Sequence, residues 1–257
     1  GQERIIRSSS IRQRGYGLIF EELDFRPTPL GDLVLRRRRI PRLGELDVYE
    51  VKLGDDFLMS SLFHDAERQL AKLGLAALEK ENLDVVVGGL GLGYTAVAAL
   101  EDSRVTSLVV VEYLEPVIEW HKNGLAPLGE TLTKDPRCRL LQADFFALSR
   151  NVANSFDPEN PTKQHDAILL DVDHTPTNVL LQTNTRFYTE EGLGELTQHL
   201  KPGGVFALWA DGEPEAFFTD RLGKVFGQAE SHTIEFANPI TEGTSKGTVY
   251  LTRTALD

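Results

Sequence analysis

The stretch that decides the fold is VVVGGLGLG, residues 85–93. Its apolar start predicts a buried strand, and the glycines after it predict a tight loop at the carboxyl end of that strand. A helical pattern follows over residues 95–100. A strand, a glycine loop and a helix in this order offer backbone N–H groups and close approach to a bound nucleoside. We therefore expect Gly89, Gly91 and Gly93 to bind a cofactor.

The spacing of these glycines narrows the kind of cofactor. They form G-x-G-x-G, whereas the dinucleotide fingerprint G-x-G-x-x-G requires glycine at the position of Tyr94. The loop therefore favours a nucleoside without a pyrophosphate over a nicotinamide dinucleotide.

Outward from the loop, short apolar runs alternate with helical patterns, which is typical of buried parallel strands with helical crossovers. The last two predicted strands are joined by a loop too short for a helical crossover, so they should pair antiparallel. This order predicts an α/β fold, the Rossmann-like class I S-adenosylmethionine-dependent methyltransferase fold. The strands are 85–87, 108–111, 139–141, 167–170, 205–209, 233–237 and 248–252, and the longer helices are 65–81, 189–200 and 214–226.

The residues before this pattern show no alternation of strands and helices. Short β-like runs separated by Pro- and Gly-containing turns predict a small N-terminal β-domain. The expected organisation is a flexible tail over 1–14, the β-domain over 15–62 and a nucleoside-binding catalytic domain over 63–257. Within the β-domain, the run Arg36–Arg39 continues an apolar segment and is interpreted as a solvated edge strand.

Composition excludes several classes of function. The net charge is −12, and residues 55–257 carry 31 acidic against 16 basic side chains, which disfavours nucleic acid and attracts cationic amines. No apolar run is long enough to span a membrane, and no signal peptide is evident, so we expect a cytoplasmic protein. The single Cys138, and histidines His64 and His121 without a partner at i+4, predict no metal site; both histidines are interpreted as surface or capping residues.

Two carboxylates follow the next two strands. Glu112 ends the strand 108–111, about 20 residues after the glycines, where a carboxylate accepts hydrogen bonds from ribose hydroxyls. Asp144 follows the strand 139–141, where it is expected to accept from an adenine amino group. The neighbours Tyr113 and Phe145 are expected to pack against the nucleoside. S-adenosylmethionine chemistry, with ribose and adenine but no phosphate, fits this set.

The catalytic candidates follow the strand 167–170 in the sequence DVDHTP, residues 171–176. Making an aliphatic amine a free nucleophile at pH 7 costs about 4.6 kcal/mol for a pKa of about 10.4, and a carboxylate base offsets part of that. We expect Asp171 to hold the substrate ammonium and accept its proton, with Asp173 and His174 as flanking contacts. Helix or loop capping is the alternative role for all three.

The order of these motifs resembles the spermidine synthase family of polyamine aminopropyltransferases, over about residues 48–252. The resemblance rests on the glycine loop, Glu112, Asp144 and a D-x-x-D-like stretch that begins at Asp171. It implies decarboxylated S-adenosylmethionine as co-substrate, a small-molecule amine as acceptor, and a homodimer or higher homo-oligomer. It also places Phe63, His64 and Trp209 in the amine-binding part of the site.

The chain departs from that family at several positions. Leu92 stands where the family's glycine loop has an aspartate that contacts the aminopropyl end, and His174 stands in place of the second acid. Phe63 lacks the phenol of the family's tyrosine, and Trp209 lies where a glutamine is common. Two alternatives therefore stay open: a methyltransferase that uses ordinary S-adenosylmethionine, and a nucleoside-binding homologue without catalysis.

Overall fold

The computed structural model describes residues 20–256. The expected tail over 1–14 lies outside these residues. Contacts divide the chain into one unit that ends at Leu62 and a second that begins at Phe63. No helix among the described residues is long and apolar enough to cross a membrane.

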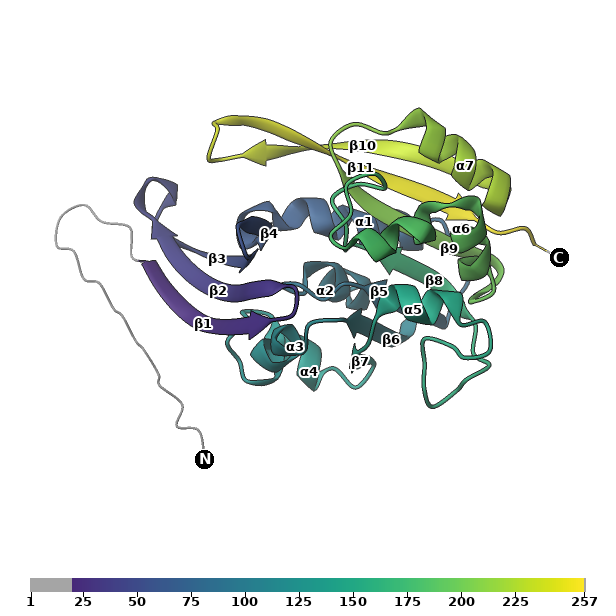
Figure 1. Ribbon diagram of the computed structural model, residues 1–257, viewed down its shortest axis with the longest axis horizontal. Helices are drawn as coiled ribbons and strands as arrows, with labels where there is room; N and C mark the ends of the chain where they lie inside the picture. Colours follow the sequence, from purple (N-terminus) through teal and green to yellow (C-terminus); the bar gives the residue numbers. More distant parts are fainter. Residues whose placement is uncertain (1–19, 257) are drawn as a thin grey trace. The chain divides into compact units, whose positions relative to one another are not determined.

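The first unit is a four-stranded antiparallel sheet in the order β1-β2-β3-β4 (Figure 1). Apolar side chains of the two central strands, among them Leu33, Leu35 and Val51, are buried. The strands are β1 (Phe20–Thr28), β2 (Gly31–Ile40), β3 (Leu46–Leu53) and β4 (Asp56–Ser60).

The interpretation of Arg36–Arg39 as an edge strand is wrong, because β2 pairs with β1 on one side and β3 on the other. The arginines are tolerated there because acidic residues of both neighbours neutralise them. Buried Glu50 on β3 pairs with Arg36 at 2.6 Å and Arg38 at 2.7 Å. The sequence of β1, FEELDFRPT, is rich in charge and lacks a continuous apolar run.

The second unit contains a seven-stranded sheet in the order β10-β11-β9-β8-β5-β6-β7. Strands β5 to β9 are parallel, and β11 is antiparallel to both β9 and β10. The predicted methyltransferase-type α/β fold with a small N-terminal β-sheet is thereby confirmed. The strands are β5 (Leu83–Gly88), β6 (Val105–Glu112), β7 (Cys138–Gln142), β8 (His165–Leu170), β9 (Leu200–Asp211), β10 (Gln228–Asn238) and β11 (Gly243–Arg253).

Seven α-helices of the described chain accompany this sheet (Figure 1). The first is shorter than the predicted helix 65–81, and the third, fourth and fifth fill gaps where the sequence pattern fixed no bounds. The helices are α1 (His64–Ala76), α2 (Tyr94–Leu100), α3 (Glu115–Lys122), α4 (Gly129–Lys134), α5 (Phe145–Arg150), α6 (Glu190–Thr197) and α7 (Ala216–Phe226).

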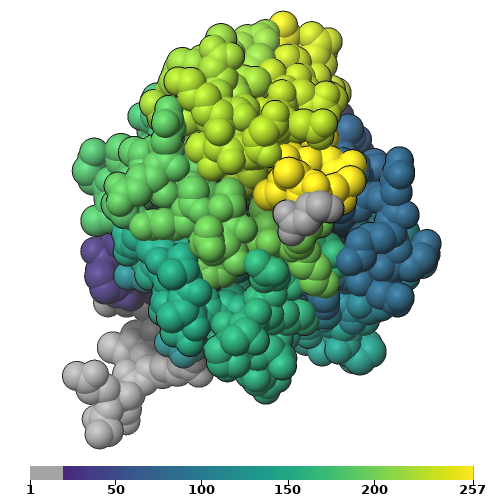
Figure 2. Space-filling model, turned by 90° about the vertical axis from the view of Figure 1, so that its right-hand side faces the viewer, coloured from purple at the N-terminus to yellow at the C-terminus, as the bar shows by residue number. Residues whose placement is uncertain are grey.

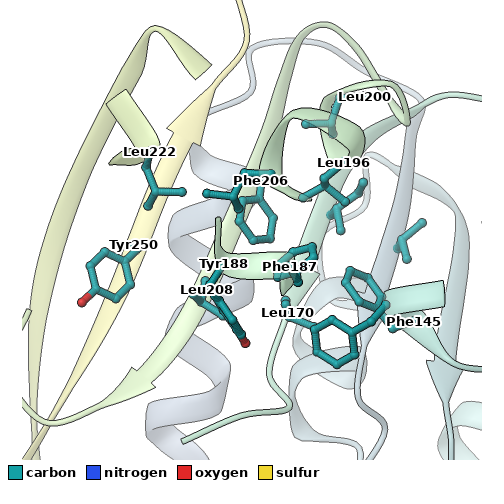
Figure 3. Packing of buried hydrophobic residues seen from close by; sticks show 14 of the residues in the cluster. Phe145, Leu170, Phe187, Tyr188, Leu196, Leu200, Phe206, Leu208, Leu222 and Tyr250 are labelled. Atoms are coloured by element: carbon teal, nitrogen blue, oxygen red, sulfur yellow. The ribbon is translucent and has the colours of Figure 1, made fainter. Parts of the chain in front are cut away.

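An aromatic core fills the space between the sheet and helices α5, α6 and α7 (Figure 3). Phe187 and Tyr188, from the 3-10 turn before α6, are each almost fully buried. Phe187 packs edge-on against Phe145 at 5.8 Å and Phe206 at 6.0 Å between ring centroids, a favourable arrangement of aromatic quadrupoles. This face of the sheet is therefore closed by apolar packing.

The amino ends of the parallel strands are closed by an ionic network. Buried Asp166 on β8 accepts from the Asp84 backbone N–H at 2.8 Å and pairs with Lys80 at 2.7 Å and Lys201 at 3.1 Å. The C-terminal residues lie against the green segment around residue 200 (Figure 2), where the Gly203 N–H donates to the Ala255 carbonyl. The charged groups at this edge are therefore paired with one another. The candidate site lies at the opposite edge, at the carboxyl ends of the strands.

Helix α1 covers the other face of the sheet and approaches it at Gly74. A Cβ atom at Gly74 would lie 2.6 Å from Cδ2 of Leu169 on β8 and 3.5 Å from Cβ of Ala207 on β9. The absence of a side chain at Gly74 lets the helix backbone lie directly on the sheet.

Gly74→Val is expected to destabilise the protein by about 1–3 kcal/mol, because the added atoms overpack the contact between α1 and β8. Urea denaturation measures the change. Gly194→Val is the matched control, since Gly194 also lies in a helix but a Cβ there meets nothing within 4 Å. Equal effects of the two substitutions would contradict close packing at Gly74.

Candidate functional site

The glycine loop connects β5 to α2 and adopts the left-handed conformation at each predicted glycine. The φ angles are +94° at Gly89, +50° at Gly91 and +91° at Gly93. Glycine adopts these angles without the steric cost that a Cβ atom imposes. The loop conformation therefore explains the residue type at all three positions.

The loop is fixed against the strands on both sides of β5. The Gly89 N–H donates to the Val111 carbonyl of β6 at 2.8 Å, and the Asp171 N–H donates to the Gly88 carbonyl at 2.9 Å. A Cβ atom at Gly89 would collide with the Asp171 carbonyl oxygen. The glycine loop and the catalytic candidate Asp171 are therefore in direct backbone contact.

Glu112 supports the same loop from the end of β6. Its Oε1 accepts from the backbone N–H groups of Leu90 at 3.3 Å and Gly91 at 3.5 Å, and its Oε2 accepts from Leu114 at 3.1 Å. Burial raises the pKa of Glu112, and these backbone donors oppose the rise. A carboxylate has about four acceptor sites, and the bonds from Leu90, Gly91 and Leu114 leave about one of them for a ribose hydroxyl.

Asp144 follows β7 and caps helix α5. Its Oδ1 accepts from the Phe146 N–H at 2.9 Å and the Ala147 N–H at 3.3 Å, which is the capping role that competes with adenine recognition. Both bonds use one oxygen, so capping does not occupy the second. The two predicted nucleoside neighbours differ: Tyr113 is 47% exposed, whereas Phe145 is 3% exposed and belongs to the aromatic core.

Asp171 lies in a strongly acidic and largely buried environment. Burial raises the pKa of Asp171 to about 7; the Asp211 carboxylate acts in the same direction, and His174 opposes it. Glu67 on α1 is a second such group, because burial and then the Asp171 carboxylate raise the pKa of Glu67 well above its usual range. A group whose pKa lies near 7 is well matched to accept a proton at neutral pH.

Glu67 and Asp211 were missed in the sequence, although each carries a signal. Glu67 lies seven residues before Gly74 and so shares the helix face that packs on the sheet, where a charged residue is unusual. Asp211 is the last residue of β9, two residues beyond the predicted strand end. The strand-end criterion that selected Glu112 and Asp144 also applies to Asp211.

His174 forms an ion pair or hydrogen bond with Asp211. His174 Nδ1 lies 3.1 Å from Asp211 Oδ2, and the Asp211 N–H donates to the His174 carbonyl at 2.7 Å. These contacts connect the loop after β8 to the end of β9. They keep the imidazole beside Asp171 at the carboxyl edge of the sheet.

Asp173 has a different environment from its neighbours. It is 3% exposed and accepts from the Leu180 N–H at 2.6 Å, the Asn184 side chain at 3.1 Å and the Tyr188 hydroxyl at 2.7 Å. All of these donors belong to the segment between β8 and α6. The arrangement gives Asp173 the geometry of a residue that organises this loop.

The three predicted amine-site residues each pack against another aromatic ring. His64 stacks on Tyr94 of α2 with 5.1 Å between ring centroids. Phe63 packs against Phe236 at 5.9 Å, and Phe236 packs against Trp209 at 6.3 Å. Trp209 follows Leu208, the partner of Leu170 in the parallel register, and so lies beside Asp171 at the strand ends.

Leu92 and His121 both lie next to Gly93 and are both buried. Leu92 is fully buried and forms part of the core. The interpretation of His121 as a surface or capping residue is wrong: it is 1% exposed, with Nδ1 2.8 Å from the Val117 carbonyl, and it lies behind Gly93. No group of three metal-ligating side chains occurs within residues 20–256.

The strand order and the glycine loop define the class: the chain has the fold of the methyltransferase-like α/β proteins. It is similar to the crystal structure of spermidine synthase from Thermotoga maritima, with a TM-score of 0.67 and 18% sequence identity. A spermidine synthase in complex with the transition-state analogue AdoDATO gives the same values. Each match covers 92% of this chain and 74% of the other. No protein-family model matches the chain.

Gly89→Ala is expected to weaken binding of 5′-methylthioadenosine at least about 10-fold, because the new methyl group displaces the loop from Asp171. Titration calorimetry measures the affinity. Gly124→Ala is the control: Gly124 also has a positive φ, of +76°, but a Cβ there meets nothing within 4 Å. Unchanged affinity in Gly89→Ala would contradict a nucleoside site at this loop.

Asp171→Asn is expected to stabilise the free protein by about 1–3 kcal/mol at pH 8 and by almost nothing near pH 4. The pKa of Asp171 is about 7 in the folded state and about 3.9 in an unfolded chain, so the folded state retains a proton that the unfolded state loses in this window. Stability therefore falls as the pH rises from 4 to 7, and the amide reduces that fall.

Urea denaturation at pH 4.5, 6 and 8 tests this expectation. Asp220→Asn, at an exposed position on α7, is the control and should leave the pH dependence unchanged. The same pH dependence in Asp171→Asn and in the original protein would refute the raised pKa.

Proposed function

We propose that this protein is a transferase that moves an aminopropyl group from decarboxylated S-adenosylmethionine to a small-molecule amine, with Asp171 as the base. The observation that carries the proposal is the position of Asp171. Asp171 directly follows β8, its backbone contacts the glycine loop, and its carboxyl group has a pKa of about 7. The proposed nucleoside-binding loop and the proposed base are therefore next to each other.

The nucleoside part of the proposed site is formed by three strand ends. The glycine loop lies under the adenosyl group, Glu112 accepts from the ribose, and Asp144 accepts from the adenine amino group. Tyr113, half exposed beside Glu112, is the aromatic residue available to the nucleoside. The similarity in fold to a spermidine synthase that holds a transition-state analogue supports this location.

The reaction follows from the chemistry of the acceptor. The amine is an ammonium ion at neutral pH, and its proton passes to the carboxylate of Asp171. The free amine nitrogen then attacks the propyl carbon next to sulfur, a C–N bond forms and the C–S bond breaks. The sulfonium takes the bonding electron pair and leaves as neutral 5′-methylthioadenosine.

The surroundings of Asp171 support an amine rather than an anionic acceptor. Glu67 and Asp211 give the site a strong negative potential that attracts cations. His174 is kept beside Asp171 by Asp211, and we propose that it flanks the acceptor. Phe63, His64 and Trp209 are proposed to contact the alkyl part of the substrate, and Asp173 to position the loop that carries His174.

A methyltransferase that uses ordinary S-adenosylmethionine is the second candidate. The observation in its favour is Leu92, whose buried side chain contributes no carboxylate to the glycine loop. Product analysis separates the two functions. Aminopropyl transfer releases 5′-methylthioadenosine, whereas methyl transfer releases S-adenosylhomocysteine and a methylated acceptor.

Asp171→Asn is expected to lower kcat by about 10²- to 10⁴-fold, because the amide cannot accept a proton, while the affinity for 5′-methylthioadenosine changes little. The assay measures 5′-methylthioadenosine released from decarboxylated S-adenosylmethionine with a series of aliphatic amines. Asp220→Asn should retain full turnover. Unchanged turnover in Asp171→Asn would remove Asp171 from the chemistry.

A further inference from the structure

Resting on the proposed function, we infer that Glu67 is a specificity residue for the co-substrate. Its carboxylate holds the ammonium at the end of the aminopropyl group and repels a co-substrate that carries an α-carboxylate. The site thereby selects decarboxylated over ordinary S-adenosylmethionine through a residue of α1 rather than of the glycine loop.

The packing of α1 places Glu67 over the catalytic strand end. Gly74 lies on Leu169 and Ala207, and Glu67 lies seven residues earlier, which is two turns along nearly the same helix face. A short segment, residues 77–82, connects α1 to β5, so α1 runs opposite to the parallel strands. The start of α1 is therefore at their carboxyl ends.

The strands place their own residues on the same face. Side chains alternate along a strand, so Asp171 follows Leu169 on the face that α1 covers, and Trp209 follows Ala207. Seven residues of helix rise about 10 Å, and two residues of strand about 7 Å, so Glu67 reaches the level of Asp171. The Asp171 carboxylate raises the pKa of Glu67, which agrees with this juxtaposition.

The chemistry of this pair requires a cation. Burial and the Asp171 carboxylate raise the pKa of Glu67, and burial and the Asp211 carboxylate raise the pKa of Asp171. An ammonium group placed between them satisfies both carboxylates. An α-carboxylate in the same position adds a further like charge, which a low-dielectric site disfavours strongly.

Leu92 cannot supply the carboxylate that binds the aminopropyl end, so Glu67 is the residue proposed to supply it. The resemblance to spermidine synthases places an aspartate at Leu92 as the group that contacts the aminopropyl end. In this chain the leucine is fully buried, and the acidic side chain comes from α1, whose Glu67 carbonyl accepts from the Thr95 hydroxyl of α2 at 3.4 Å. We infer that the ammonium of the aminopropyl group is bound by a carboxylate of α1 and not by one of the glycine loop.

The test uses titration calorimetry of the full chain with three ligands: decarboxylated S-adenosylmethionine, S-adenosylmethionine and 5′-methylthioadenosine. The original protein is expected to bind the decarboxylated compound at least about 10-fold more tightly than S-adenosylmethionine. Glu67→Gln should weaken binding of the decarboxylated compound about 10- to 100-fold. It should leave 5′-methylthioadenosine, which has neither charged group, within about 2-fold.

Glu67→Gln is expected to fold, because it keeps the shape of the side chain and removes a like charge next to Asp171. Glu79→Gln is the matched control: Glu79 is exposed beyond the far end of α1, and its replacement should change none of the three affinities.

The outcomes separate this inference from the proposed function. Equal weakening of all three ligands in Glu67→Gln would show a structural role only and overturn the inference. The inference would also be overturned if the original protein bound 5′-methylthioadenosine but bound decarboxylated and ordinary S-adenosylmethionine equally tightly. The proposed nucleoside site would then still stand. Failure of 5′-methylthioadenosine to bind would overturn the proposed function and the role of Glu67 together.

Discussion

The backbone contact between the glycine loop and Asp171 is the constraint on which the site depends. Gly88 accepts from the Asp171 N–H, and Gly89 lies so close to the Asp171 carbonyl that no Cβ atom fits. Since β8 and β5 are neighbours in the parallel sheet, this contact fixes the end of one strand against the loop of the other. The backbone of Asp171 is therefore held by a hydrogen bond and close packing against the loop.

Much of the fold was predictable because parallel strands buried on both faces leave continuous apolar runs in the sequence. The strand containing Val85 and the strand before Glu112 were predicted from such runs. The C-terminal pair was predicted to be antiparallel because its connecting loop is too short for a helical crossover. The N-terminal sheet was harder, because its arginines are neutralised by residues of neighbouring strands. Burial of Glu50 between Arg36 and Arg38 depends on register, which single-residue hydrophobicity does not reveal.

Site residues that directly follow a strand could be predicted from the sequence. Site residues that lie on a helix packed against the sheet could not. Glu112, Asp144 and Asp171 occupy strand ends, and all three lie at the carboxyl edge of the sheet. Glu67 reaches the same edge only because α1 packs on the sheet at Gly74. His121 was misjudged for a related reason, since its burial depends on the approach of α3 to the glycine loop.

Asp171 and Asp173 show why a motif alone does not assign chemical roles. The two carboxylates are two residues apart, yet Asp173 is saturated by donors of its own loop, while Asp171 faces other carboxylates. Burial raises the pKa of Asp173, and the hydrogen bonds from its own loop oppose that rise. Burial and like charge destabilise the charged form of Asp171.

The free energy stored in that like-charge environment has a direct functional meaning. In the free protein the Glu67–Asp171 pair relieves its repulsion by retaining a proton at neutral pH. A bound cation relieves the same repulsion electrostatically, so the pair releases its proton when the cationic ligand arrives. In the proposed mechanism, a bound cation therefore favours the ionised form of Asp171, which accepts the proton of the acceptor amine. The buried like charges lower the stability of the protein at neutral pH and, in the proposed function, favour for the same physical reason a cationic co-substrate over one that carries a carboxylate.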